Sequence, residues 1–349
     1  MSPTHPRRPF PRARSVPALA TALLVSAACA AEAPNEGEGG GSAGEAAATV
    51  VTTPPAEELQ CAPDNGGITL PEGFCAVIAS EGVGRARHVT VRDDGAVFVA
   101  RPDASRSGET GGVVALRDTD GDGRFDVEER WGERGGNEVL LDGEDLWFAP
   151  NDAVLRYRVP AGSLTPEGEP VTVVSGLPAD RSHTAKSVAL GADGSLLVNI
   201  GAPSNACQTE PRTEGSPGVD PCPQLEDRGG IWRFDAEATG QTQADGSRFA
   251  TGLRNVVALA LQPGTGQLWG VQHGRDQLHS LFPELYTVED NAELPSEEMV
   301  AIDEGDDFGW PYCYHDWQQG VKLLTPEYGG DGSEVGRCAD AEDPLVAFP

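Results

Sequence analysis

Five acidic residues in one short stretch have the types and the spacing of a calcium-binding loop. Counted from the first aspartate, carboxylates stand at positions 1, 3, 5, 9 and 12, and a glycine stands at position 6. Hard oxygen ligands at alternating positions can wrap around one Ca²⁺ ion. The alternative is an acidic hairpin tip, because the flanking residues have the pattern of strands rather than of EF-hand helices. The predicted ligands are Asp118, Asp120, Asp122, Asp126 and Glu129.

Two further segments carry side chains suited to proton transfer and to anion binding. His183 stands just before an alternating apolar run, and imidazole is the side chain best suited to accept a proton near neutral pH. Arg254 and Asn255 stand at the corresponding place before a later run. A guanidinium fork matches a carboxylate, and an amide both donates and accepts hydrogen bonds. A lone histidine or arginine is also often a packing residue, so these roles depend on the surrounding elements.

The elements that would position these side chains belong to a sequence pattern that occurs four times along the chain. Each copy is an alternating apolar run, a turn on glycine and a second apolar run, which is the strongest local signal of a β-hairpin. The intervals of 48, 51 and 72 residues separate the turn glycines Gly95, Gly143, Gly194 and Gly266. Each hairpin is followed by another strand-like run, at residues 112–117, 153–157, 230–234 and 298–302. Two hairpins per copy make one four-stranded unit.

A repeat of this size is typical of a propeller blade, and similar units copied along a chain favour a β-propeller over a β-sandwich. We therefore expect an all-β protein in which residues 58–349 form about four to five blades of a six-bladed β-propeller. The 44 glycines and 28 prolines are consistent with a fold rich in turns. The innermost strands of a propeller begin around an axial pocket, where His183, Arg254 and Asn255 would meet.

The charge and the N-terminus indicate an exported protein that does not bind nucleic acid. The formal net charge is −30 at pH 7, which repels phosphate backbones. Residues 1–29 combine arginines with an apolar run too short to span a bilayer, which predicts a signal peptide. Cys29 follows small residues where a bacterial lipoprotein carries its lipid anchor; ordinary signal-peptidase cleavage is the alternative. Residues 30–57 predict a flexible linker, and we expect a periplasmic protein or a surface lipoprotein.

Six cysteines remain if Cys29 carries a lipid, and an even number in an exported protein predicts disulfides. Six cysteines allow 15 pairings. We expect the sequential one, since each pair would close a short loop. A zinc site is the rival interpretation, but the sequence contains no Cys/His cluster with zinc-ligand spacing. The predicted disulfides are Cys61–Cys75, Cys207–Cys222 and Cys313–Cys338.

Taken together, these sequence motifs resemble those of the glucose/sorbosone dehydrogenase family, which are soluble six-bladed propellers that use pyrroloquinoline quinone (PQQ). The resemblance covers about residues 70–349. It is carried by His183 ahead of an Ala-Asp-Gly turn, by Gly-Leu-Arg-Asn at 252–255 and by Gly-Asp-Asp-Phe-Gly-Trp-Pro-Tyr at 305–312. Ser-Asn-Ala-Cys at 204–207 with Asp-Pro-Cys at 220–222 is similar to the sorbosone dehydrogenase branch.

The resemblance implies roles for five residues. His183 matches the general base that takes the proton of the substrate hydroxyl. Arg254 and Asn255 match residues that hold the quinone. His273 and Gly274 match a pair beside the cofactor, in which the carbonyl of the glycine is offered to Ca²⁺. PQQ carries three carboxylates, so an acidic protein needs cations such as Arg and Ca²⁺ to bind it.

The sequence departs from the family at two places. Glucose-oxidising members have, after Ile-Gly, an aspartate that orients the base, and Ala202 stands there in this chain. Family members also continue beyond the position of Pro349 with the blades that close the ring. The resemblance therefore implies a propeller that lacks its C-terminal blades.

The expected function is oxidation of an aldose, a sorbosone or a similar sugar or polyol, with PQQ and Ca²⁺ as cofactors and an external electron acceptor. Two alternatives belong to other classes. One is a calcium-stabilised binding propeller without catalysis, and the other is a calcium-dependent lactonase. Analogy of fold alone supports all three.

Overall fold

The computed structural model describes residues 59–103, 108–180 and 182–349. The predicted signal peptide, the lipid attachment at Cys29 and the predicted linker lie outside the described residues. Among the described residues, no helix has the length and apolar character needed to cross a bilayer.

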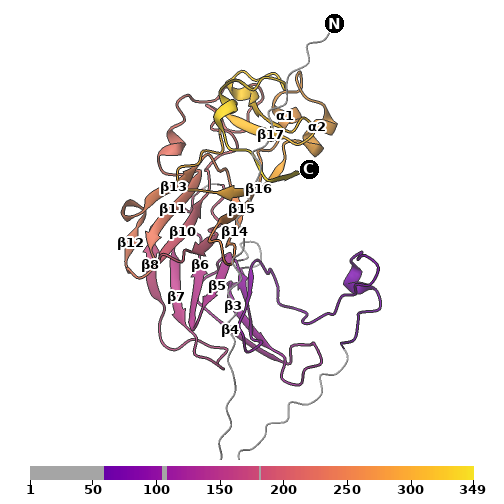
Figure 1. Ribbon diagram of the computed structural model, residues 1–349, viewed down its shortest axis with the longest axis vertical. Helices are drawn as coiled ribbons and strands as arrows, with labels where there is room; N and C mark the ends of the chain where they lie inside the picture. Colours follow the sequence, from indigo (N-terminus) through magenta and orange to yellow (C-terminus); the bar gives the residue numbers. More distant parts are fainter. Residues whose placement is uncertain (1–58, 104–107, 181) are drawn as a thin grey trace, which may run out of the picture. The chain divides into compact units, whose positions relative to one another are not determined.

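Four antiparallel sheets follow one another in chain order, and we name them blades 1 to 4 (Figure 1). Blade 1 contains β1 (Val89–Val91), β2 (Val97–Arg101), β3 (Gly112–Arg117) and β4 (Val127–Trp131). Blade 2 contains β5 (Glu138–Asp142), β6 (Asp145–Ala149), β7 (Val154–Arg158) and β8 (Val171–Ser175). Blade 3 contains β9 (Val188–Leu190), β10 (Ser195–Ile200), β11 (Gly230–Asp235) and β13 (Ser247–Thr251). Blade 4 contains β14 (Val256–Leu261), β15 (Leu268–Gln272), β16 (Glu297–Ile302) and β19 (Val346–Phe348).

This arrangement confirms the prediction of an all-β propeller with four to five blades. The smaller elements are β12 (Gln241–Thr242), which pairs in parallel with β8 of the preceding blade, and the hairpin of β17 (Cys313–Asp316) and β18 (Val321–Leu324). The α-helices of the described residues are short: α1 (Leu278–Leu281) and α2 (Val288–Glu293).

The hairpin turns have the chemistry that the sequence predicted. Gly95 and Gly194 adopt φ of 82° and 81°, a region that favours glycine. The aspartate before each glycine accepts a backbone hydrogen bond: Asp94 from Ala96 at 3.1 Å and Asp193 from Ser195 at 3.1 Å. Local turn chemistry therefore sets the register of each inner hairpin.

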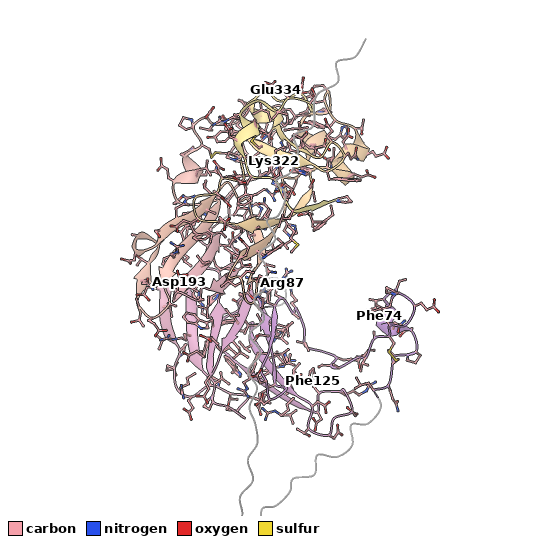
Figure 2. The ribbon with its side chains drawn as sticks, viewed as in Figure 1. Phe74, Arg87, Phe125, Asp193, Lys322 and Glu334 are labelled. Carbon is pink, nitrogen blue, oxygen red and sulfur yellow. A yellow bond between two sulfur atoms is a disulfide. The ribbon has the colours of Figure 1, made fainter. Side chains whose placement is uncertain are left out.

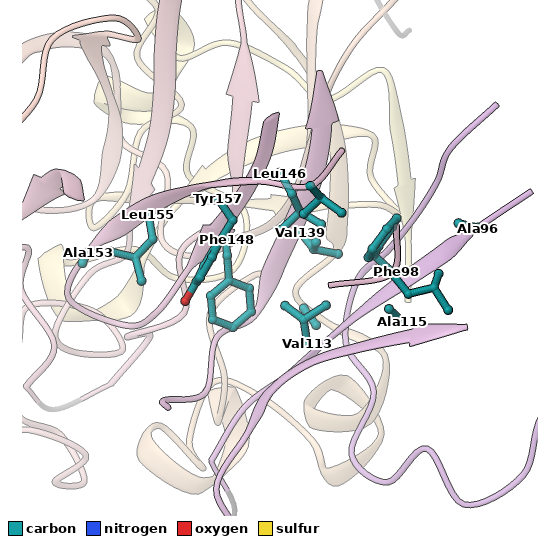
Figure 3. Packing of buried hydrophobic residues seen from close by; sticks show 13 residues of the cluster. Ala96, Phe98, Val113, Ala115, Val139, Leu146, Phe148, Ala153, Leu155 and Tyr157 are labelled. Carbon is teal, nitrogen blue, oxygen red and sulfur yellow. The ribbon is translucent and has the colours of Figure 1, made fainter. Parts of the chain in front are cut away.

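The core lies between successive blades, because alternate residues of each strand face opposite sides. In β10, Leu196 and Val198 pack toward blade 2, whereas Leu197 packs toward blade 4. Figure 3 shows the cluster between blades 1 and 2, where Phe98 and Phe148 are fully buried. Blades 2 and 3 each have a neighbouring blade on both sides, so face-to-face packing buries both of their faces.

Long connections join some of the strands, and disulfides close loops in two of these connections. All three predicted pairings are confirmed: Cys61–Cys75, Cys207–Cys222 and Cys313–Cys338. The second disulfide lies in the connection from β10 to β11, and the third joins β17 to the segment after β18.

We expect Phe148→Ala to lower the free energy of unfolding by about 3–5 kcal/mol, because it leaves a cavity between two blades. The matched control is Phe74→Ala, since Phe74 is 70% exposed (Figure 2); its change should stay within about 0.5 kcal/mol. Guanidinium chloride unfolding measures both. Equal effects of the two substitutions would show that the cluster does not join the blades as described.

Candidate functional site

Residues at repeat-equivalent positions meet at one end of the innermost strands. His88, Asn137, Ser187 and Asn255 each stand directly before β1, β5, β9 or β14. Together with His273, which follows β15, they line a cavity of about 510 Å³.

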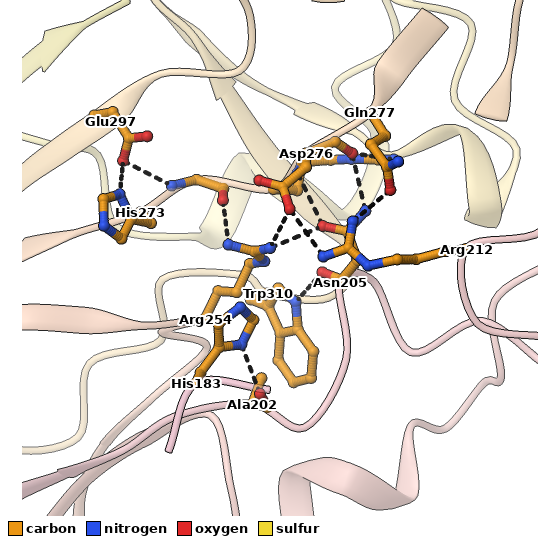
Figure 4. Close-up of polar contacts among 12 residues, drawn as sticks. His183, Ala202, Asn205, Arg212, Arg254, His273, Asp276, Gln277, Glu297 and Trp310 are labelled. Carbon is orange, nitrogen blue, oxygen red and sulfur yellow. Dashed lines mark hydrogen bonds and ion pairs between the residues drawn. The ribbon is translucent and has the colours of Figure 1, made fainter. Parts of the chain in front are cut away.

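The guanidinium of Arg254 is the centre of a hydrogen-bond network (Figure 4). Its residue is 3% exposed. Nη1 donates to the Gly274 carbonyl at 2.6 Å, and Nη2 donates to Asp276 Oδ2 at 3.0 Å and to Asn205 Oδ1 at 3.1 Å. Asn205 is fixed in turn by the Asp276 amide, which donates to Oδ1 at 2.8 Å. One buried cation thereby holds the connections that follow β10 and β15.

Two guanidinium groups of the network meet at a single carboxylate. Asp276 also accepts from Arg212 at 2.9 Å, so two guanidinium groups share one carboxylate. Burial opposes ionisation of Asp276, but the charge of Arg254 together with the hydrogen bond and charge of Arg212 outweighs it and lowers the pKa of this carboxyl. In a chain of net charge −30, this is a place where two cations come together.

His183 is held by the main chain. It adopts φ of 55°, and its Nδ1 lies 2.6 Å from the Ala202 carbonyl oxygen. The Ala202 amide donates to the Arg254 carbonyl at 2.8 Å, which ties the imidazole to the guanidinium network. A Cβ on Gly201 would lie 2.6 Å from the His183 carbonyl oxygen, so this position requires glycine.

This geometry assigns the tautomer of His183. A carbonyl only accepts, so Nδ1 carries the proton and Nε2 keeps its lone pair. Burial, and after it the charge of Arg254, lower the pKa of His183 to about 4. The ring is therefore neutral near pH 7 and can accept a proton at Nε2. The Ala202 carbonyl orients the ring at the position where the sequence analysis noted a missing aspartate.

His273 and Gly274 form the other side of the network. Glu297 Oε2 lies 2.9 Å from His273 Nδ1 and accepts from the Gly274 amide at 3.2 Å. The hydrogen bond to Glu297 raises the pKa of His273. The Gly274 carbonyl accepts from Arg254, so a Ca²⁺ ion at this oxygen would stand beside a guanidinium of like charge.

Two buried polar atoms at this site have no hydrogen-bond partner among the described residues: Arg254 Nε and Asn255 Oδ1. An unpaired buried donor or acceptor costs about 1–3 kcal/mol. A donor on a cation beside an amide acceptor is the chemistry that a carboxylated, hydrogen-bonding cofactor would satisfy. The residues present therefore fit such a group.

The acidic loop lies elsewhere, at the tip between β3 and β4. Ligand oxygens of Asp118, Asp120 and Asp122 lie within 4.8 Å of one another. Asp118 accepts from the backbone amides of Gly121 and Gly123 at 2.7 and 2.9 Å. The other two predicted ligands are not part of this group, because Asp126 binds Thr119 and Glu129 lies within β4.

Sequence reasoning assigned no role to several residues of the site. Asn205 stood only within the Ser-Asn-Ala-Cys motif and Asp276 was not singled out, although both hold Arg254. His88 and the buried Glu138 form a pair, with Nδ1 and Oε1 2.5 Å apart, and Glu138 raises the pKa of His88. The signal that would have found His88 is its place in the repeat, directly before an innermost strand like Asn255.

We expect Arg254→Gln to raise the pKa of His183 from about 4 toward 6.5, because the charge of Arg254 opposes protonation of the ring. Burial remains, so the new pKa should stay below 6.5. NMR titration of the imidazole signals measures it. Arg233→Gln is the control, since Arg233 pairs with Glu304 at the interface of blades 3 and 4. An unchanged His183 titration in Arg254→Gln would contradict the electrostatic coupling.

Comparisons with solved structures agree with the fold. A Trichoderma reesei member of carbohydrate-active enzyme family AA12 matches with a TM-score of 0.60 and 18% identity, covering 77% of this chain and 68% of the other. Its calcium structure matches with a TM-score of 0.58 at the same identity and coverage. The holo form of the PQQ domain of a Coprinopsis cinerea pyranose dehydrogenase matches with a TM-score of 0.60 and 16% identity, covering 77% of this chain and 66% of the other.

The family assignment rests on the sequence itself. Among curated proteins, none matches this chain. The profile described as TrAA12-like matches residues 68–322, which is most of the chain and contains every residue of the Arg254 network. The resemblance predicted from the sequence is thereby confirmed, and this chain belongs to the TrAA12-like family.

Proposed function

We propose that this protein is an exported, PQQ-dependent oxidoreductase that oxidises an aldose, a sorbosone or a similar sugar or polyol. The observation that carries the proposal is a neutral, main-chain-held imidazole at His183 next to the buried cation of Arg254. The matched Coprinopsis structure is named as a PQQ domain of a pyranose dehydrogenase, which supports the cofactor and the substrate class.

The residues that would hold PQQ are those with unsatisfied or cationic groups. Arg254 and Arg212 are two cations that share one aspartate, and Asn255 Oδ1 has no hydrogen-bond partner among the described residues. Asn255 and His273 both line the cavity of about 510 Å³, His273 from the end of β15. When bound, the quinone would accept a hydride from the carbon of the sugar that carries the reacting hydroxyl.

His183 would take the other half of the reaction. The proton of the substrate hydroxyl passes to Nε2 while the C–H electron pair leaves with the hydride, so the alcohol loses two electrons and two hydrogens. The Ala202 carbonyl keeps the proton on Nδ1, and the positive φ of His183 directs the ring. General-base catalysis of this kind contributes about 10²–10⁴-fold.

The three disulfides support an oxidising compartment, and we propose the periplasm or the cell surface with an external electron acceptor. Attachment of lipid at Cys29 belongs to the same proposal. The alternatives gain less support from the site. In the described part of the chain, only Asp118, Asp120 and Asp122 form a group of three possible metal ligands, and none of them lines the axial cavity that a lactonase would use.

We expect His183→Asn to bind PQQ, followed by its absorbance, but to reduce dye about 10²–10⁴-fold more slowly with a panel of aldoses. The reason is that the substrate proton then has no acceptor. His279→Asn is the matched control, because that ring lies in α1, binds the Tyr286 carbonyl and makes no hydrogen bond with the Arg254 network among the residues that the structure describes. Full turnover by His183→Asn would refute the assignment of the base, and failure of the wild-type chain to bind PQQ would refute the quinoprotein proposal.

We also propose Ca²⁺ at Asp118, Asp120 and Asp122, where it would stabilise the tip of blade 1. The calcium structure of the Trichoderma protein supports calcium as an ion for this fold. Here Ca²⁺ should raise the melting temperature, and Asp118→Asn should remove that increase because it removes a ligand charge. Asp193→Asn is the control, since Asp193 also accepts a backbone hydrogen bond in a turn but does not belong to the cluster of possible metal ligands. A melting temperature indifferent to Ca²⁺ would contradict the site.

A further inference from the structure

The chain contains only two lysines, and both are buried. Lys186 is 0% exposed and Lys322 is 2% exposed. Burying an ammonium is costly, so a lysine stays inside a protein only where partners hold it. Lys186 stands three residues after His183 and two residues before β9.

The partners of Lys186 are main-chain carbonyls on both sides of His183. Its Nζ donates to the Thr184 carbonyl at 2.6 Å and to the Pro178 carbonyl at 2.9 Å. The Thr184 peptide directly follows His183, whose φ of 55° is a conformation that non-glycine residues rarely adopt. A second buried donor, Asn199 Nδ2, reaches the Ala185 carbonyl at 3.4 Å.

These bonds hold the peptides next to His183. In this backbone conformation, Nδ1 of His183 reaches the Ala202 carbonyl. Without Lys186, the Thr184 and Pro178 carbonyls would lose a charge-assisted donor, and the strained φ would be free to relax.

We propose that Lys186 is a positioning residue for His183, and that its charged ammonium is required to keep the imidazole in the orientation that accepts the substrate proton. The inference rests on the proposed role of His183 as the base. It adds a group that does not touch substrate or cofactor and that acts through two peptide carbonyls.

The charge on Lys186 changes with pH near neutrality. Burial, and after it the charge of Arg228, lower the pKa of Lys186 to about 7, while Asp152 and Asp180 act in the opposite direction. Arg228 and Asp180 are themselves an ion pair at 2.7 Å. Turnover should therefore fall as pH rises through about 7, and it should fall separately as pH drops through the His183 pKa of about 4.

Stability should change with pH in the opposite direction from activity. A lysine whose folded pKa lies below its unfolded value binds fewer protons in the folded state between about 7 and 10.5. The contribution of Lys186 to stability therefore increases as pH rises through this range. A role confined to stability would not produce an alkaline loss of turnover.

The test uses the small number of lysines. In the full chain labelled with ¹³C-lysine, NMR should resolve two side-chain signals, and Lys186→Met should remove the one that titrates near pH 7. Without any cofactor, the His183 imidazole signals of the wild-type chain should shift with the same midpoint and should not do so in Lys186→Met. His183 signals unchanged between pH 6 and 8 would overturn the proposal, even if the variant failed to fold.

Turnover gives the second readout. Lys186→Met should lower kcat by about tenfold to a hundredfold, as expected for a displaced base. Its pH profile should also lack the alkaline limb, which is the fall in turnover as pH rises through about 7. Lys322→Met, which removes the other buried ammonium, should keep the alkaline limb. Wild-type kcat with an intact limb in Lys186→Met would overturn the proposal, whereas PQQ binding without turnover in every variant would refute the proposed function alone.

Discussion

The burial of the Arg254 guanidinium is the constraint on which the rest of the site depends. A guanidinium cannot lose its proton in a protein, so its N–H groups must find acceptors or remain unpaired at high cost. Gly274, Asp276 and Asn205 supply three of them from two connections far apart in sequence. The two connections follow strands of the adjacent blades 3 and 4, and Arg254 bonds to both of them. Its Nε has no hydrogen-bond partner among the described residues.

The second principle of the site is that peptide groups take roles usually given to side chains. The Ala202 carbonyl orients His183, and the Gly274 carbonyl accepts from Arg254. Lys186, in turn, binds only carbonyls among the described residues. Main-chain acceptors keep their position whatever the side chain, which is why an alanine can stand at position 202 beside an oriented imidazole. It also makes the site dependent on glycine at position 201, where a Cβ would collide with His183.

The fold could be predicted from the sequence because its determinants are local. Alternation of apolar residues and turns such as Asp94-Gly95 set the hairpins, and their repetition set the blades. The site could be predicted only in part. His183, Arg254 and Asn255 stand where the repeat places residues at strand starts, whereas the hold of Asp276 on Arg254 arises from folding of long connections. In the acidic loop, the sequence pattern matched a calcium-binding loop but did not reveal that Asp126 is bound to Thr119.

The most direct test of the account is a single turnover under anaerobic conditions, with PQQ-loaded full chain mixed with an aldose and no electron acceptor. If His183 and the Arg254 network oxidise a sugar at bound quinone, the quinone absorbance should be lost in one exponential phase, with one equivalent of oxidised sugar formed. The rate should follow the protonation of His183 at acid pH. Quinone absorbance that stays unchanged with every aldose, polyol and sorbosone offered would contradict the central claim.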